Sequence, residues 1–162
     1  MTINVVAITD AHWPQIETIQ AAAYYDVVPE AMAVLRSKWR ASPDTCFVAV
    51  DHQHRCVGYL LSHPWQGEQP PKLDTEIAGS ITATELFIHD LAIAPPARGQ
   101  GIAAALFQRV LDTVIEKGFA ALFLVAVQNS QAYWHNFGFT QKYGYAVPDS
   151  YGDGACLMHK PI

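Results

Sequence analysis

The sequence predicts an α/β (α+β) domain in which helices flank a mixed β-sheet. Half of the 162 residues are apolar, and short apolar runs of strand length alternate along the chain with segments of helical periodicity. A strand-like run over 86–93 also breaks at two prolines and restarts as a helix. Interleaved strands and helices of this kind form one sheet covered by helices. The length suffices for one full core, so we expect a single domain over residues 1–162.

The first part of the chain is predicted to contain strand 3–8, helix 9–23, helix 29–40 and strands 46–51 and 56–62. Thr9 and Asp10 are typical helix caps, so they mark the start of the first helix. Pro29 suits the first turn of the second helix because that turn does not need its N–H. The polar turn between the last two runs predicts a hairpin.

The second part is predicted to contain strand 86–93, helix 101–117, strand 121–127, helix 130–136 and strands 141–145 and 155–160. The apolar face of the longest helix comprises Leu106, Val110, Val114 and Ile115. Gly118 is suited to end that helix. The run 121–127 is apolar throughout, which is typical of a strand covered on both faces.

Residues 65–84 form a long connection rich in Gly, Pro, Thr and Glu, without periodicity. We expect this segment to bury no apolar face and to be mobile. It leads directly into the strand 86–93, and two interpretations stay open: it closes over a bound substrate, or it is surface decoration.

Charge and composition exclude several classes of protein. The net charge is −5 and the ten basic residues are scattered, so we expect no nucleic-acid partner. No leader and no apolar run of membrane-spanning length is evident, so we expect a cytoplasmic protein without membrane contact. The three cysteines are expected to be reduced thiols. The acidic balance suits a cationic amine as a partner, although it also suits plain solubility.

The segment from Pro95 to Ala103 predicts an anion-binding site. A strand ends, a turn with Gly99 and Gly101 follows, and a helix begins, which aims backbone N–H groups outward at the helix N-terminus. A nucleotide-binding Walker loop needs a Lys-Ser or Lys-Thr step, and a dinucleotide fingerprint needs three glycines. No Lys-Ser or Lys-Thr step follows here, and this segment has only the two glycines, so both of these motifs are excluded.

What remains, Arg98-x-x-Gly101-x-Ala103, resembles the signature of the GNAT superfamily of N-acetyltransferases. The context agrees, because a strand precedes the motif, a helix follows it, and a second strand leads to the run Phe137-Gly-Phe139. The order of elements is similar to the GNAT arrangement along the whole chain. This resemblance implies a mixed, mostly antiparallel sheet of about seven strands flanked by about four helices.

The resemblance also implies an activity. We expect transfer of an acetyl group from acetyl-CoA to an amine of a small molecule or protein, by a monomer or homodimer. The alternative is a module that binds or senses acyl-CoA without turnover. The resemblance places the pyrophosphate of acetyl-CoA on backbone amides of Arg98, Gly99, Gln100, Gly101, Ile102 and Ala103. It assigns the pantetheine arm to the backbone of Leu91, Ala92 and Ile93. Asn129 either contacts that arm or caps a helix together with Ser130.

Candidate catalytic residues lie on the strand 86–93 and just before it. Strict alternation puts Glu85, Phe87, His89 and Leu91 on one face, with Asp90 on the other unless a bulge intervenes. His89 is the first choice for the base that accepts a proton from the amine, because histidine suits proton transfer near neutral pH. Glu85 is the reserve candidate.

The proton donor to the leaving thiolate does not follow the family pattern. The family's usual tyrosine, four residues before the Gly of Gly-Phe, is replaced here by Trp134, and indole is not an acid. Tyr133 is therefore the fallback donor. The resemblance also assigns substrate binding to Tyr24, Tyr25 and Asp26, whose aromatic rings and carboxylate suit an ammonium group. We expect no metal, because the His-x-His pair at 52 and 54 has no third ligand nearby in the sequence.

Overall fold

The computed structural model describes residues 2–162 except 24–28, 67–69, 78, 80 and 128. The described residues form a seven-stranded sheet of order β1-β2-β3-β4-β5-β7-β6. The strands are β1 Asn4–Ala7, β2 Phe47–Val50, β3 Cys56–Pro64, β4 Glu85–Ile93, β5 Ala121–Ala126, β6 Thr140–Gln141 and β7 Cys156–Pro161. Adjacent strands pair antiparallel except β4 and β5, which are parallel. The predicted mixed, mostly antiparallel sheet is thereby confirmed.

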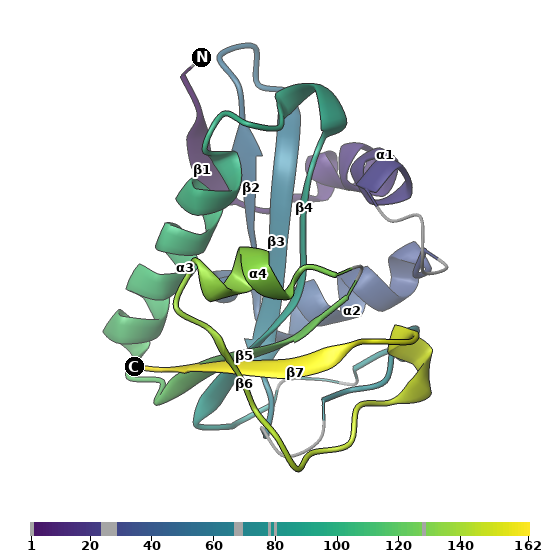
Figure 1. The fold of residues 1–162 in the computed structure, drawn as a ribbon. Helices are drawn as coiled ribbons and strands as arrows, with labels where there is room; N and C mark the ends of the chain where they lie inside the picture. The colour runs from purple at the N-terminus through teal and green to yellow at the C-terminus, as the bar shows by residue number, and fades with distance from the viewer. Residues whose placement is uncertain (1, 24–28, 67–69, 78, 80, 128) are drawn as a thin grey trace.

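Four α-helices cover the two faces of the sheet (Figure 1). They are α1 Trp13–Ala23, α2 Met32–Ala41, α3 Ile102–Lys117 and α4 Gln131–His135. Apolar side chains of α3 and α4 form one buried cluster with β2, β3, β4, β5 and β7. Side chains of α1 and α2 form a second cluster on the opposite face. Helices α1, α2 and α3 thus each contribute an apolar stripe to the core, as amphipathic periodicity predicts, whereas α4 contributes Trp134.

Some predicted details are wrong. Ile115 is expected on the buried face of α3, but 59% of its surface is exposed. The buried stripe instead follows Leu106, Val110 and Val114, and the next residue is rotated by about 100° around the helix. Helix α2 begins at Met32 instead of residue 29, so Pro29 and Glu30 lie in the preceding loop.

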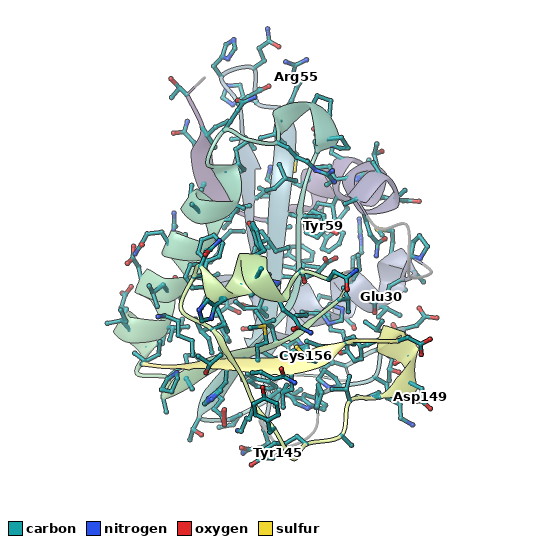
Figure 2. All side chains as sticks on the ribbon, viewed as in Figure 1. Glu30, Arg55, Tyr59, Tyr145, Asp149 and Cys156 are labelled. Carbon is teal, nitrogen blue, oxygen red and sulfur yellow. The ribbon has the colours of Figure 1, made fainter. Side chains whose placement is uncertain are left out.

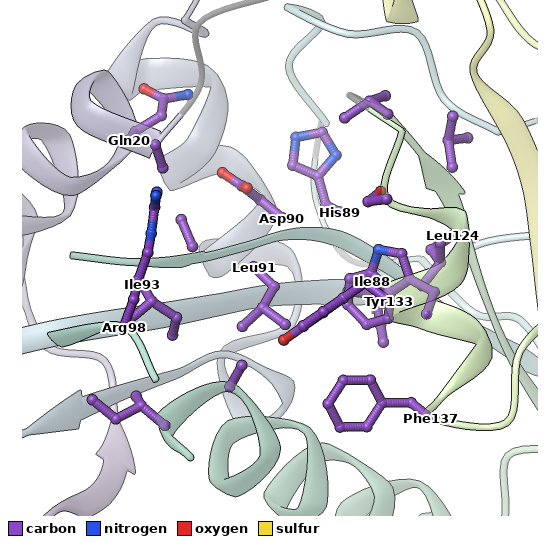
Figure 3. A pocket seen from close by; sticks show the side chains of 18 of the residues that line it. Gln20, Ile88, His89, Asp90, Leu91, Ile93, Arg98, Leu124, Tyr133 and Phe137 are labelled. Atoms are coloured by element: carbon purple, nitrogen blue, oxygen red, sulfur yellow. The ribbon is translucent and has the colours of Figure 1, made fainter. Parts of the chain in front are cut away.

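A β-bulge interrupts β4. Leu61 of β3 pairs with Asp90 and Ser62 pairs with Ile88, so His89 is the extra residue on β4. A bulge puts two consecutive side chains on the same side of a strand. Figure 3 shows His89 and Asp90 on one side of β4 and Leu91 on the other. The expectation that His89 and Leu91 share a face is therefore wrong, because strict alternation fails at the bulge.

Strands β4 and β5 separate shortly after they meet. Their parallel register runs from the pair Glu85 and Ala121 to the pair Ile88 and Leu124. Beyond this point β4 continues beside β3, whereas β5 continues beside β7 across the lower part of Figure 1. The sheet is therefore open between the second half of β4 and the end of β5.

Residues 70–77, which we name the strap, pack against the rest of the molecule. Pro70 and Pro71 are buried, and Leu73 joins an apolar cluster that contains Phe87 and Tyr151. The expectation that this connection buries no apolar face is thus wrong, because the strap contacts segments that are distant in sequence. Its mobility stays a prediction.

Candidate active site

A cavity of about 580 Å³ occupies the opening between β4 and β5. Its walls come from β4, β5, the turn before α3, α4 and the loop before α2 (Figure 3). We distinguish two sides by their residues. The loop side comprises Arg98, Gly99, Gly101, Ile102 and Ala103, and the bulge side comprises Glu30, Leu73, His89, Asp90 and Tyr151.

The loop side presents a helix N-terminus with room in front of it. Gly101 caps α3 with φ of 76°, a left-handed conformation that favours glycine. A Cβ atom built on Gly99 or Gly101 would meet no protein atom within 4 Å. The first N–H groups of a helix have no partners inside the helix, and the helix dipole favours an anion there. This side can therefore hold a phosphate group close to the backbone. Gln100, also predicted for this site, does not line the cavity.

On the bulge side, His89 pairs with Glu30. The distance between His89 Nε2 and Glu30 Oε1 is 2.7 Å, and the exposed fractions of the two side chains are 0% and 8%. Figure 2 labels Glu30 at the approach to α2. His89 Nδ1 is buried and has no hydrogen-bond partner among the described residues. When the carboxylate accepts the Nε2 proton, neutral His89 keeps a lone pair on Nδ1.

Glu30 is ionised at neutral pH. Burial alone would raise its pKa, but the hydrogen bond and charge of His89, the backbone N–H of Asp74 and the charge of Lys38 together lower it. The Asp74 N–H lies 2.8 Å from Glu30 Oε2, so both carboxylate oxygens are hydrogen-bonded. Lys38 is itself buried, its pKa is lowered by burial although Glu30 opposes that shift, and its Nζ donates to the Thr75 carbonyl at 2.8 Å.

A second imidazole lies near His89. The ring centroids of His63 and His89 are 6.2 Å apart. Burial, and then the charge of His89, lower the pKa of His63 to about 3. His63 is therefore neutral near neutral pH, and its Nδ1 lies 3.0 Å from the Pro64 carbonyl oxygen. His63 does not line the cavity, whereas His89 does.

The second residue of the bulge, Asp90, also lines the cavity. Its side chain is buried, and the Tyr59 hydroxyl donates to Oδ2 at 2.6 Å. The bulge therefore brings a carboxylate next to the imidazole on the same side of β4.

The structure separates the other predicted residues. Tyr133 lines the cavity and is 42% exposed, and burial raises the pKa of its phenol. Trp134 is buried and also lines the cavity. Glu85 begins β4, beside Ala121, and does not line the cavity. Asn129 is exposed with φ of 59° and does not line the cavity, although Ser130 does.

Other expectations concern residues 24–26, a metal ion, the cysteines and a membrane. Tyr24, Tyr25 and Asp26 lie outside the described residues. The described residues contain no group of three His, Cys, Asp or Glu side chains arranged for a metal ion. The three cysteines are free and buried. No helix in the described part of the chain is long and apolar enough to cross a membrane.

Sequence reasoning missed most of the bulge side. Periodicity places Glu30 inside a helix, and 59 positions separate it from His89. Leu73 and Tyr151 lie in segments with no periodicity that would link them to β4. The alternation along β4 leaves room for a bulge near Asp90, but nothing in the sequence fixes its position.

Comparison with known proteins identifies the family and supports the fold. The model of the acetyltransferase (GNAT) family matches residues 13–139. No curated protein sequence is a significant match. Similar solved structures include the ribosomal-protein-S18-alanine N-acetyltransferase of Escherichia coli, with 16% identity, a TM-score of 0.74 and coverage of 99% of this chain and 94% of that one.

Two further structures were solved with ligands. Naa50 of Arabidopsis thaliana, in complex with the bisubstrate analogue CoA-Ac-MVNAL, has 15% identity, a TM-score of 0.72 and complete coverage of both chains, 100% each. A phosphinothricin acetyltransferase of Sinorhizobium meliloti, in complex with acetyl-CoA, has 19% identity, a TM-score of 0.69 and coverage of 100% and 89%. These identities speak for the fold alone. The family match covers most of the sequence, and the chain belongs to the acetyltransferase (GNAT) family.

Proposed function

We propose that this protein transfers the acetyl group of acetyl-CoA to a primary amine. The observation that carries the proposal is a single cavity with an open helix N-terminus on one side and a buried imidazole–carboxylate pair on the other. The first feature suits the pyrophosphate of a CoA thioester, and the second suits removal of a proton from an amine.

The loop side fits the cofactor portion of the substrate. The backbone of Arg98–Ala103 would bind the pyrophosphate, because the positions around Gly99 and Gly101 leave open space where a Cβ would stand. Leu91, Ala92 and Ile93 line the cavity along β4 and would contact the pantetheine arm. Asn129 would contact the same arm at the end of β5. Acetyl-CoA supplies the thioester whose carbonyl carbon accepts the amine.

On the bulge side, the amine nitrogen would bond to the acetyl carbon while the carbon–sulfur bond breaks and sulfur keeps the electron pair. The proton that nitrogen loses would pass to Nδ1 of His89, directly or through water. Glu30 would hold the His89 tautomer with Nε2–H toward its carboxylate and would stabilise the imidazolium that forms. Glu85 stays a reserve candidate for the base, although it lies outside the cavity lining.

Tyr133 is proposed as the proton donor to the leaving thiolate. Its phenol lines the cavity and is protonated at neutral pH, and the pKa that burial raises makes it a weak acid, so the thiolate would receive the proton late or through water. Trp134 would pack under the ligand without exchanging a proton. Tyr24, Tyr25 and Asp26 stay candidates for binding the amine.

A second function is a module that binds acyl-CoA without turnover, which the replacement of the usual tyrosine by Trp134 favours. Incubation with acetyl-CoA and a panel of primary amines, followed by free thiol release, separates the two. Amine-dependent thiol release above the enzyme-free rate supports the enzyme. Calorimetric binding of acetyl-CoA without thiol release across the panel supports the binding module.

A further inference from the structure

We propose that the acceptor is a small primary amine that has an apolar body and no carboxylate beside its amino group. This inference rests on the proposed function and narrows its substrate class. It starts from the strap, residues 70–77, which walls the bulge side of the cavity through Leu73.

Hydrogen bonds fix the strap to two parts of the chain that lie far apart in sequence. The pairs, donor first, are Tyr151 Oη and Pro71 O, Leu73 N and Ser150 Oγ, Asp74 N and Glu30 Oε2, Ala31 N and Asp74 Oδ1, Lys38 Nζ and Thr75 O, and Ile77 N and Ser37 Oγ. The strap therefore joins α2 and the two residues before it to the turn Asp149–Tyr151 before β7. From this fixed backbone beside the cavity we infer a preference for a small amine over a polypeptide acceptor.

The bulge side also selects by charge. Glu30 and Asp90 place two carboxylates on its wall. Among the described lining residues, the only Lys or Arg is Arg98, which belongs to the loop side. Lys38 does not line the cavity and its Nζ donates to the Thr75 carbonyl, although its charge also acts on Glu30. An ammonium group is attracted to this side, whereas an acceptor carboxylate meets like charge.

Apart from Gln20, whose amide lies against Glu30, several lining residues on and next to this side are apolar. Leu73, Val125, Val127 and Tyr151 line the cavity and pack in one cluster around Phe87 and Phe123. An apolar acceptor body gains free energy by leaving water here. His89 is one of the polar residues of this lining, and its Nδ1 is buried without a hydrogen-bond partner among the described residues.

Four acceptors with the same aromatic body test the inference: 2-phenylethylamine, phenylalaninol, phenylalanine and a phenylalanyl-alanyl-alanine amide. Thiol release from acetyl-CoA gives kcat/KM for each. We expect phenylalanine to be about 100-fold poorer than phenylalaninol, since a carboxylate replaces a neutral hydroxymethyl group close to Glu30 and Asp90. We expect the tripeptide to be at least as poor as phenylalanine, and 2-phenylethylamine to be a good acceptor.

The variant Asp90→Asn identifies the source of the discrimination. The amide oxygen can still accept from Tyr59, but the charge is gone, so the ratio of phenylalaninol to phenylalanine is expected to fall to about 10. Asp112→Asn removes a carboxylate that is exposed on α3, outside the cavity lining, and should leave the ratio at its parental value. If Asp90→Asn does not fold, the ratio of kcat/KM for phenylalaninol to that for phenylalanine in the parent decides whether a carboxylate beside the amino group is disfavoured.

The outcomes distinguish a failure of the proposed acceptor class from a failure of the proposed acetyltransferase activity. Phenylalanine or the tripeptide used as well as phenylalaninol would overturn the inference and leave the acetyltransferase in place. Binding of acetyl-CoA with no thiol release from any acceptor, including the wider amine panel, would overturn the proposed function and the inference with it.

Discussion

The loop side and the bulge side of the cavity are built in different ways. The loop side is one continuous stretch, from Arg98 to Ala103, whose geometry follows from a proline-terminated strand, two glycines and a helix start. The bulge side combines side chains from four segments, and the pair His89 and Glu30 spans 59 positions. The geometry of the loop side can be predicted from neighbouring residues. The bulge side exists only after the sheet, the strap and α2 have packed together.

The largest effect is expected from a substitution that disables the loop side and leaves the bulge side intact. Gly101→Asp should abolish acetyl-CoA binding in calorimetry, because a carboxylate and a Cβ would occupy the space for the pyrophosphate. The new Cβ meets no protein atom within 4 Å, so the substitution costs only the strain of a left-handed φ at the helix start, and the helical circular dichroism should persist.

Gly118→Asp is the matched control for this change. It lies at the other end of α3 with φ of 78° and equally open surroundings, so the backbone strain is the same without a ligand site. Retained affinity in Gly101→Asp, or equal loss in both variants, would contradict the assignment of the loop side.

Disabling the bulge side alone should separate chemistry from cofactor binding. His89→Ala is expected to lower kcat/KM for the best amine by about 10²-fold, the usual range for a lost general base. The dissociation constant of acetyl-CoA should stay within about twofold, since the loop side is intact. His54→Ala, in the exposed β2–β3 turn, serves as the control. A His89→Ala enzyme with parental turnover and an unaltered pH–rate profile would remove His89 from the mechanism.

His63, whose ring lies behind the bulge side with its centroid 6.2 Å from that of His89, should make the stability of the fold sensitive to acid. The pKa of His63 in the folded protein is lowered to about 3, so the unfolded chain binds more protons between about pH 3 and 6.5. Above pH 6.5, His63 is neutral in both states and does not reduce the free energy of unfolding. As the pH falls toward about 3, His63 takes up a proton only in the unfolded chain, so the free energy of unfolding decreases. Lowering the pH from 7 to 5 should cost about 2 kcal/mol of unfolding free energy from this residue.

Urea denaturation at the two pH values measures this loss. His63→Phe, which keeps an aromatic ring beside Phe87 and Trp65, should reduce the pH dependence by that amount. An identical pH dependence in the parent and the variant would show that His63 is not the group responsible.

Removal of the strap should affect amine binding on the bulge side and leave acetyl-CoA binding on the loop side unchanged. Replacing Pro70–Ile77 with a short Gly-Ser linker removes the contacts to Glu30, Lys38 and Tyr151. We expect the KM for the amine to rise about 10-fold because Leu73 no longer walls the cavity and Glu30 loses one donor, an effect of roughly 1.4 kcal/mol. Acetyl-CoA affinity should not change. Kinetics identical to the parent for the best amine would show that the strap is surface decoration.

The same contrast explains how much the sequence could predict. The order of strands and helices and the loop side follow from local periodicity, prolines and glycines, and they were predicted. The position of the bulge could not be predicted, because it depends on how Leu61 and Ser62 of β3 align with β4. Glu30 and the strap could not be assigned either, because their partners are set by tertiary packing. Ile115 shows the limit of helical periodicity, since adjacent apolar residues on α3 differ by about 100° in direction.

The central claim is that His89 and Glu30 act as one proton-accepting unit. A double-mutant cycle tests it directly, with kcat/KM measured for the parent, His89→Ala, Glu30→Gln and the double variant. The amide oxygen introduced by Glu30→Gln could still accept from the Asp74 N–H but would carry no charge to stabilise the imidazolium, so we expect about a 10-fold loss for this variant. Because Glu30 acts through His89, the double variant should be no slower than His89→Ala alone. Losses that multiply, to about 10³-fold in the double variant, would contradict the account.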